Sequence, residues 1–243
     1  MRSWGITDTG LVREENQDAY AVIAAGQFTV AVVCDGMGGT YGGQLASSVA
    51  VRTYQEQMAQ QLRDGMSTQQ VAQVSSYCVS QANDAIRQEA ASRPGYERMG
   101  TTLVSAVACD DSAVVTNIGD SRAYLITQGG ITRISKDHSV VEDMIDRGEL
   151  TPETARNHPK RNLITRALGP ERQANADTFP LTWKQGDYLL LCSDGLFNTV
   201  SDMEILFEVI HNGEPGDCLS RLLELSRQRG APDNVTAVLL MNI

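Results

Sequence analysis

The middle of the chain contains four short apolar runs that are separated by turns of only a few residues. The runs cover residues 102–108, 113–118, 123–127 and 131–134, and Asp-Asp, Gly-Asp-Ser and Gly-Gly sequences lie between them. Turns this short can reverse the chain between antiparallel strands, whereas parallel neighbours need a crossover of about a dozen residues or more. We therefore predict a meander of antiparallel strands here and largely antiparallel sheets in the whole protein.

The other strands and helices are predicted from the period of the hydrophobic pattern around this meander. Short runs rich in Val, Ile and Leu predict strands at residues 19–23, 28–34, 188–192 and 235–241. Apolar residues three or four apart predict helices at residues 44–62, 67–93, 202–210 and 217–229, and a short helix from Pro152. Ser67 with Gln70, and Ser139 with Glu142, have the spacing of capping boxes. With helices outside antiparallel sheets, the predicted fold class is α+β.

The length of the chain, 243 residues, is compatible with one sheet-rich domain. No internal repeat, linker or low-complexity segment divides it, so we predict a single domain over residues 1–243. Residues 158–186 have weak periodicity and several turn formers, which indicates an irregular insertion. We place this candidate flap, a lid that faces substrate, at about residues 148–186.

Charge and cysteine content exclude several classes of protein. Thirty acidic and 20 basic residues give a net charge of -10, which disfavours binding to nucleic acid. The five cysteines are odd in number and lack Cys-x-x-Cys spacing, as in reduced cytosolic proteins. We find no apolar stretch long enough for a membrane span and no export signal. We expect a cytoplasmic protein without membrane insertion.

Four aspartates end or precede apolar runs: Asp35, Asp120, Asp194 and Asp233. Tight turns are one explanation, because Asp-Gly and Asp-Asn are common turn sequences. A hairpin turn must lead into a second strand, however, and helical patterns follow both Asp35 and Asp194. The alternative hypothesis is that these carboxylates converge at one end of the sheets, where cations would offset their repulsion.

The type of ligand indicates which ion would suit such a site. Aspartate and backbone oxygens are typical of Mg²⁺ or Mn²⁺, whereas Zn²⁺ usually binds His or Cys, and the three histidines show no ligand spacing. A thiolate phosphatase is excluded, because the sixth residue after Cys34 is Thr40 and that after Cys192 is Asn198, where arginine is needed. The glycine-rich run at residues 35–43 contains neither nucleotide-binding motif, and no Gly-x-Ser-x-Gly elbow occurs.

Seven motifs follow one another in order along the whole chain: Arg13-Glu14-Glu15-Asn16-Gln17-Asp18, Asp35-Gly36-Met37-Gly38-Gly39, Met99-Gly100-Thr101-Thr102, Gly119-Asp120-Ser121-Arg122, Asp137-His138, Ser193-Asp194-Gly195 and Asp233-Asn234-Val235-Thr236. Together they resemble the metal-dependent serine/threonine protein phosphatases of type 2C, in their compact bacterial form. The resemblance implies a four-layer α/β/β/α sandwich of two mostly antiparallel sheets, with two Mn²⁺ or Mg²⁺ ions in a cleft at one edge.

The resemblance also implies roles for individual residues. Asp35 would bridge the two ions, and Asp194 and Asp233 would complete the ligands of one of them. The Gly36 carbonyl would bind the other ion, and Asp18 would hold its waters. The remaining two residues implied are Asp120, which with Asp194 would bind a third, weaker ion, and Arg13, which would grip the substrate phosphate.

The implied reaction is hydrolysis of phosphoserine and phosphothreonine by a water that bridges the two ions. The implied partners are phosphorylated proteins and a cognate bacterial Ser/Thr kinase, and we expect a monomer. Met37 and Thr40 stand where many relatives have a histidine, so the proton donor to the leaving group is unassigned. His138 and His158 are candidates, although an isolated histidine is usually structural.

Several readings stay open from the sequence. Simple strand propensity explains Thr101 and Thr102, Asp137 is interpreted as a helix cap, and Cys34 and Cys192 as core thiols. One rival function is a pseudophosphatase that binds phosphoproteins without turnover, although no metal aspartate has been lost. A second is a dinuclear hydrolase that acts on small phosphoesters or nucleotides.

Overall fold

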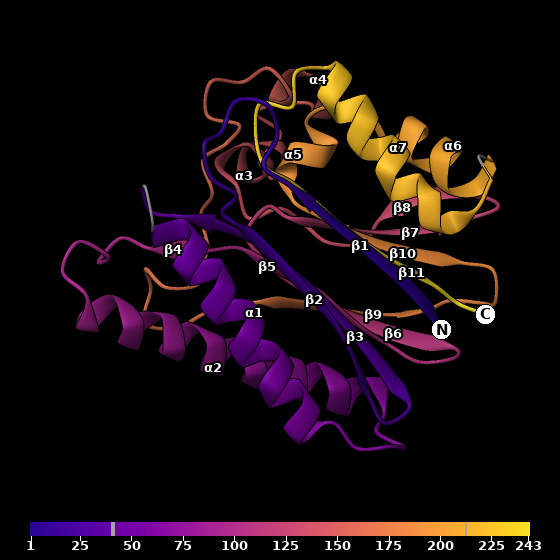
Figure 1. Ribbon diagram of the computed structural model, residues 1–243, viewed down its shortest axis with the longest axis horizontal. Coiled ribbons are helices and arrows are strands. Elements are labelled where there is room, and N and C mark those ends of the chain that lie inside the picture. Colours follow the sequence, from indigo (N-terminus) through magenta and orange to yellow (C-terminus); the bar gives the residue numbers. More distant parts are fainter. Residues whose placement is uncertain (40–41, 212) are drawn as a thin grey trace.

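The computed structural model describes residues 1–39, 42–211 and 213–243. Two antiparallel sheets face each other at the centre, and helices cover their outer faces, α1 and α2 on one side and α6 and α7 on the other (Figure 1). The predicted α+β sandwich of four layers is confirmed. Among the described residues, none of the helices combines the length and the apolar character that a bilayer crossing requires.

The first sheet contains most of the N-terminal half of the chain. Its strands are β2 (Asp18–Ala25), β3 (Phe28–Met37), β5 (Leu103–Ala108), β6 (Ser112–Ile118) and β9 (Asp177–Thr182), in that order, and β4 (Gly100–Thr101) pairs with β3. Its outer face is covered by α1 (Gly42–Gln61) and α2 (Thr68–Ser92). The predicted capping box at the start of α2 is present, with both the Ser67 and the Gln70 side chains bonded to the backbone.

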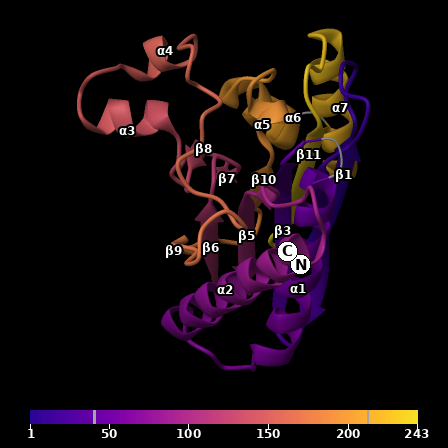
Figure 2. The same ribbon diagram turned by 90° about the vertical axis from the view of Figure 1, so that its left-hand side faces the viewer.

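The second sheet brings the two ends of the chain together. Its order is β1 (Arg2–Asp8), β11 (Val235–Met241), β10 (Tyr188–Cys192), β7 (Arg122–Thr127) and β8 (Gly130–Arg133). The helices against it are α5 (Asp194–Phe197), α6 (Asp202–His211) and α7 (Pro215–Gln228). Two short helices, α3 (Val140–Asp146) and α4 (Pro152–Ala155), project to one side of the sheets (Figure 2).

The apolar core has three parts that follow from this layering. One part lies between the first sheet and its helices, one between the second sheet and its helices, and one between the two sheets. The central strands of the two sheets are therefore buried on both faces, and every residue of β5 and β10 is buried. This explains why these strands appear in the sequence as continuous apolar runs and not as alternating ones.

The predicted meander is wrong at its centre. β5 pairs with β6 in the first sheet and β7 pairs with β8 in the second, so residues 119–121 carry the chain from one sheet to the other. A turn of this length is compatible with both a hairpin and a crossing between sheets, and the packing of the sheets decides between them. Strands β1 and β9 were not predicted, and β9 lies within the region that we expected to be irregular.

A buried hydroxyl cluster gives a direct test of the packing on the first sheet. The Tyr54 hydroxyl lies 2.6 Å from Ser75 Oγ and 2.7 Å from Ser105 Oγ, and thus joins α1 to α2 and β5. We expect Tyr54→Phe to lower the free energy of unfolding by about 1–3 kcal/mol, because buried partners are left unsatisfied. The control Tyr77→Phe, at a side chain that is 48% exposed, is expected to change it by less than about 0.5 kcal/mol. Urea denaturation measures both, and equal losses would contradict this assignment.

Candidate metal centre

A polar cleft with a volume of about 480 Å³ opens where the aspartate-bearing strand ends meet. Six of the seven residues predicted for the site line it, namely Arg13, Asp35, Gly36, Asp120, Asp194 and Asp233. The seventh, Asp18, is only 9% exposed and is not part of the lining. The structure therefore brings the predicted residues together from segments spread over the whole chain.

The ends of strands from both sheets place these carboxylates. Asp18 and Asp35 are direct partners in the β2–β3 register of the first sheet. In the second sheet, Asp194 begins α5 directly after β10, and Asp233 precedes β11. Asp120 lies on the crossing at residues 119–121, which connects the two sheets.

Two threonines to which the sequence analysis assigned no chemistry hold Asp35 in place. The Asp35 N–H donates to Thr102 Oγ1 at 2.9 Å, and Thr101 Oγ1 donates to the Asp35 carbonyl at 2.8 Å. Thr102 Oγ1 also lies 2.7 Å from Ser121 Oγ, next to Asp120. The signal was present in the sequence, because both threonines belong to one of the seven motifs, but strand propensity was sufficient to explain them.

Close backbone packing surrounds Gly36. A Cβ atom at this position would lie 2.1 Å from the Gly43 carbonyl oxygen and 2.6 Å from that of Gln17. The Gly36 N–H donates to the same Gln17 carbonyl at 3.1 Å. Only glycine fits here, because the start of α1 and the segment before β2 both press against this end of β3.

Burial and mutual repulsion oppose the ionisation of these carboxyl groups and raise their pKa values. Burial raises the pKa of Asp18 and of Asp120 to about 6 and that of Asp194 to about 8, from an ordinary value of 3.8. Burial also raises the pKa of Asp35 well above its usual range, and the charges of Asp18 and Asp194 add to this effect. For Asp194, burial is the largest cause of the raised pKa, and the charges of Asp120 and Asp233 raise it further.

Two atoms in this cluster indicate that it suits a cation. Oδ1 of Asp18 and Oδ1 of Asp194 are buried without a hydrogen-bond partner, a costly arrangement for carboxylate oxygens unless a positive charge satisfies them. Within the described residues, no group of three or more His, Cys, Asp or Glu side chains is arranged to hold a metal ion. Mg²⁺ and Mn²⁺ do not need such a group, because these ions commonly keep several waters and take few protein carboxylates.

Arg13 stands at the rim of the cleft, on the loop between β1 and β2. Its side chain is 55% exposed, and Nη2 donates to Oδ2 of Asp233 at 2.7 Å. The guanidinium is therefore next to the aspartate cluster but open to solvent on its other side. An anion in the cleft could accept from its planar set of donors while it contacts cations held by the carboxylates.

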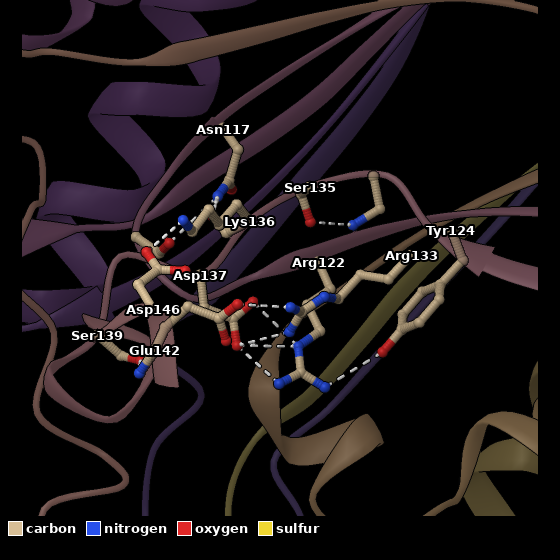
Figure 3. Close-up of polar contacts among 12 residues, drawn as sticks. Asn117, Arg122, Tyr124, Arg133, Ser135, Lys136, Asp137, Ser139, Glu142 and Asp146 are labelled. Atoms are coloured by element: carbon tan, nitrogen blue, oxygen red, sulfur yellow. Dashed lines mark hydrogen bonds and ion pairs between the residues drawn. The ribbon is translucent and has the colours of Figure 1, made fainter. Parts of the chain in front are cut away.

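A second ion-pair network connects Arg122, Arg133 and Asp137 (Figure 3). The Arg122 guanidinium donates to Asp137, with 2.6 Å between Nη2 and Oδ2, and it lies 3.7 Å from the centre of the Phe197 ring on α5. The interpretation of Asp137 as a helix cap is thus wrong, because Ser139 caps α3 by accepting from the Glu142 N–H.

The capping box predicted at Ser139 is only half formed, because another ion pair engages the Glu142 side chain. The Glu142 carboxylate does not return to the backbone but accepts from Arg133 at 2.7 Å. The network therefore ties α3 and the strands β7 and β8 to the short helix that begins with Asp194.

None of the three histidines, all of them in the described part of the chain, lines the cleft. The N–H of Gly119 donates to Nδ1 of buried His138, and Nε2 of the same ring lies 3.0 Å from Oδ2 of Asp177 and 3.2 Å from Nη1 of Arg166. His158 Nδ1 accepts from the Lys160 N–H. Met37 lines the cleft, and Thr40 lies outside the described residues.

The cysteines beside two of the aspartates are core thiols, as predicted. Cys34 and Cys192 are fully buried and free of disulfides, and burial raises the pKa of both thiols. A buried thiol with a raised pKa is a poor nucleophile, which agrees with the exclusion of thiolate chemistry from the sequence.

Known proteins match this chain over most of its length. The protein phosphatase 2C family matches residues 12–228. The serine/threonine phosphatase stp of Listeria innocua is 32% identical over 235 residues, which cover 96% of this chain and 93% of the relative.

Solved structures are similar over nearly the whole chain. Serine/threonine phosphatase Stp1 from Staphylococcus aureus is 33% identical with a TM-score of 0.92, covering 98% of this chain and 94% of that one. The catalytic domain of the protein phosphatase PstP, solved in complex with two manganese ions, is 34% identical with a TM-score of 0.83, covering 98% of this chain and 96% of that one. The chain therefore belongs to the protein phosphatase 2C family, as the seven motifs in its sequence indicate.

Proposed function

We propose that this protein hydrolyses phosphoserine and phosphothreonine in proteins and that Mn²⁺ or Mg²⁺ is its cofactor. The observation that carries the proposal is the set of five converging aspartates, two of them with unpartnered buried oxygens, beside an arginine that faces solvent. The relatives named above as serine/threonine phosphatases, and the manganese ions bound by PstP, support it.

Each residue of the centre would have its own role in holding the ions. Asp35 would contact both ions, Asp194 and Asp233 would complete the ligands of one of them, and the Gly36 carbonyl would bind the other. Two such ions, when bound, make a shared water nucleophilic near neutral pH. Asp18 orients water at the centre from its buried position, where Ser193 Oγ donates to its Oδ2 at 2.7 Å.

Two further residues complete the proposed site. Asp120 and Asp194 would hold a third, weaker ion, which agrees with the effect of the Asp120 charge on Asp194. Arg13 binds the phosphoryl oxygens and stabilises the charge that they carry during in-line displacement. Because no histidine lines the cleft, we propose that water supplies the proton to the leaving seryl or threonyl oxygen.

The surroundings of the cleft suggest how a phosphoprotein is received. Residues 1–243 would form one catalytic domain, and the part of the predicted flap (about residues 148–186) that precedes β9 would lie beside the phosphate site, because β9 itself belongs to the first sheet. Asn162 and Ile164 of this segment line the cleft. We further propose that the protein is a cytoplasmic monomer that acts on the substrates of a cognate bacterial Ser/Thr kinase.

Replacing Asp194 tests the metal assignment. We expect Asp194→Ala to lower kcat/KM for a phosphothreonine peptide by roughly a thousandfold or more, because it removes a ligand and its charge. Isothermal titration should show weaker Mn²⁺ binding, while circular dichroism stays unchanged. Asp202→Ala, which removes an exposed carboxylate on α6, is the control. Activity within twofold of wild type, or full turnover in excess chelator, would rule out the assignment.

Replacing Arg13 tests phosphate binding. We expect Arg13→Ala to raise KM about tenfold or more and to change kcat much less, because the guanidinium contacts the phosphate in both the ground and the transition state. Arg52→Ala, at an exposed arginine on α1, should change neither constant. A lost kcat with an unchanged KM would show instead that Arg13 acts only in the transition state.

Acidity should stabilise the metal-free protein. Asp18, Asp120 and Asp194 have folded pKa values of about 6, 6 and 8, above the ordinary value of 3.8. Between pH 6 and pH 8 the folded state therefore holds protons that the unfolded state has already lost, so stability falls as pH rises. Calorimetry in chelator should show a lower Tm at pH 8 than at pH 6, and saturating Mn²⁺ should reduce or reverse this difference. An equal pH dependence in Asp194→Asn would contradict the contribution of Asp194.

A further inference from the structure

The loop that carries Arg13 is held by one buried side chain from the opposite end of the sequence. Asn234 is 6% exposed and follows Asp233 at the start of β11. Its Nδ2 donates to the carbonyl oxygens of Thr9 and Glu15, both at 2.9 Å. Its Oδ1 accepts from the N–H of Gln17 at 2.8 Å. One amide group thus contacts the loop on both sides of Arg13.

These contacts need the amide of asparagine. A carboxylate of the same shape has no donor for the two carbonyls, and a hydroxyl group cannot make all three bonds. The side chain is buried, so a lost bond would leave backbone groups with few other partners.

The backbone around Asn234 makes this anchor rigid. The Leu11 N–H donates to the Ala231 carbonyl at 2.9 Å. A Cβ atom at Gly10, where φ is +79°, would lie 2.3 Å from the Asp233 carbonyl oxygen, and one at Gly195 would lie 2.0 Å from that of Asn234. The loop, the Asp233 backbone and the start of α5 are therefore packed against one another at backbone distance.

We propose that Asn234 is a positioning residue that fixes Arg13 relative to the aspartate centre and thereby sets the affinity for the substrate phosphate. The inference rests on the proposed function, in which Arg13 binds phosphate. The Arg13 side chain is more than half exposed and makes one ion pair, with Asp233, so the backbone of its loop must define where the guanidinium can reach. Asn234 contacts that backbone before and after Arg13.

The chain offers a matched control in Asn83 of α2. This side chain is 1% exposed, its Nδ2 donates to the carbonyls of Glu171 and Arg172 at 3.1 and 3.4 Å, and its Oδ1 accepts from the Gly169 N–H at 2.7 Å. It makes the same three types of bond, but to residues 169–172 of the segment proposed as the flap and not to the loop of Arg13. Asn83→Ala should therefore reproduce the loss of stability without the link to Arg13.

The test is a double-mutant cycle between Asn234 and Arg13 on the Mn²⁺-loaded protein. Asn234→Ala is expected to raise KM for a phosphothreonine peptide, and the dissociation constant of inorganic phosphate measured by calorimetry, about tenfold each, with kcat within about threefold. In the Arg13→Ala background, Asn234→Ala should raise KM and the dissociation constant of phosphate by less than about twofold, since the effects of two residues that act through one contact are not additive. Asn83→Ala should change KM and the dissociation constant of phosphate by the same factor in the wild-type and the Arg13→Ala backgrounds.

Hydrogen exchange gives a readout that does not depend on turnover. The Gln17 amide, bonded to Asn234 Oδ1, should exchange faster in Asn234→Ala than in wild type or Asn83→Ala, without substrate or metal. If Asn234→Ala does not fold, Asn234→Gln takes its place, because glutamine keeps the amide group on a side chain that is one methylene longer. Its effects on KM and phosphate affinity should also be non-additive with those of Arg13→Ala, but smaller. Multiplicative effects in the cycle, unchanged phosphate affinity or an unchanged Gln17 amide would overturn the inference. Wild-type protein without Mn²⁺-dependent turnover would instead refute the proposed function.

Discussion

The site depends on the repulsion among carboxylates that the fold holds together in a partly desolvated cleft. Burial and like charge both oppose ionisation of Asp18, Asp35, Asp120 and Asp194. A site of this kind is destabilising in itself, and it persists because a three-part apolar core and fixed backbone bonds hold it. In the proposed function the same repulsion gives the cleft its chemistry, since divalent cations would relieve it and would present their charge to a phosphate.

Neutral side chains around the carboxylates do the positioning. Hydroxyl groups of Thr101 and Thr102 bind the backbone of Asp35, and Ser193 binds the side chain of Asp18. The opposite charges of Arg122 and Asp137 cancel each other, and the Arg122 guanidinium packs against Phe197 of α5. These hydroxyl groups and this ion pair therefore add little net charge of their own to the surroundings of the aspartates.

Much of the fold and of the site could be predicted because local patterns determine it. The helix capped by Ser67 and the buried strands show clear periods, and aspartates directly after apolar runs indicated Asp35 and Asp194. What failed depends on contacts between distant segments. The turn at residues 119–121 has the length of a hairpin, and only the docking of two sheets makes it a crossing. Asp137 has the spacing of a cap, but Arg122, 15 residues earlier, takes its carboxylate. Neither choice is visible in a local window of sequence.

A single hydroxyl group connects both halves of the sandwich at the centre. Ser193 Oγ donates to Asp18 of the first sheet and accepts from the Thr236 N–H of the second at 3.0 Å. Neither sheet alone can assemble this contact, so a half-folded chain lacks an ordered reaction centre. During synthesis, an incomplete polypeptide would thus stay inert toward the phosphorylated proteins around it, and hydrolytic competence would arise only when the two halves have docked.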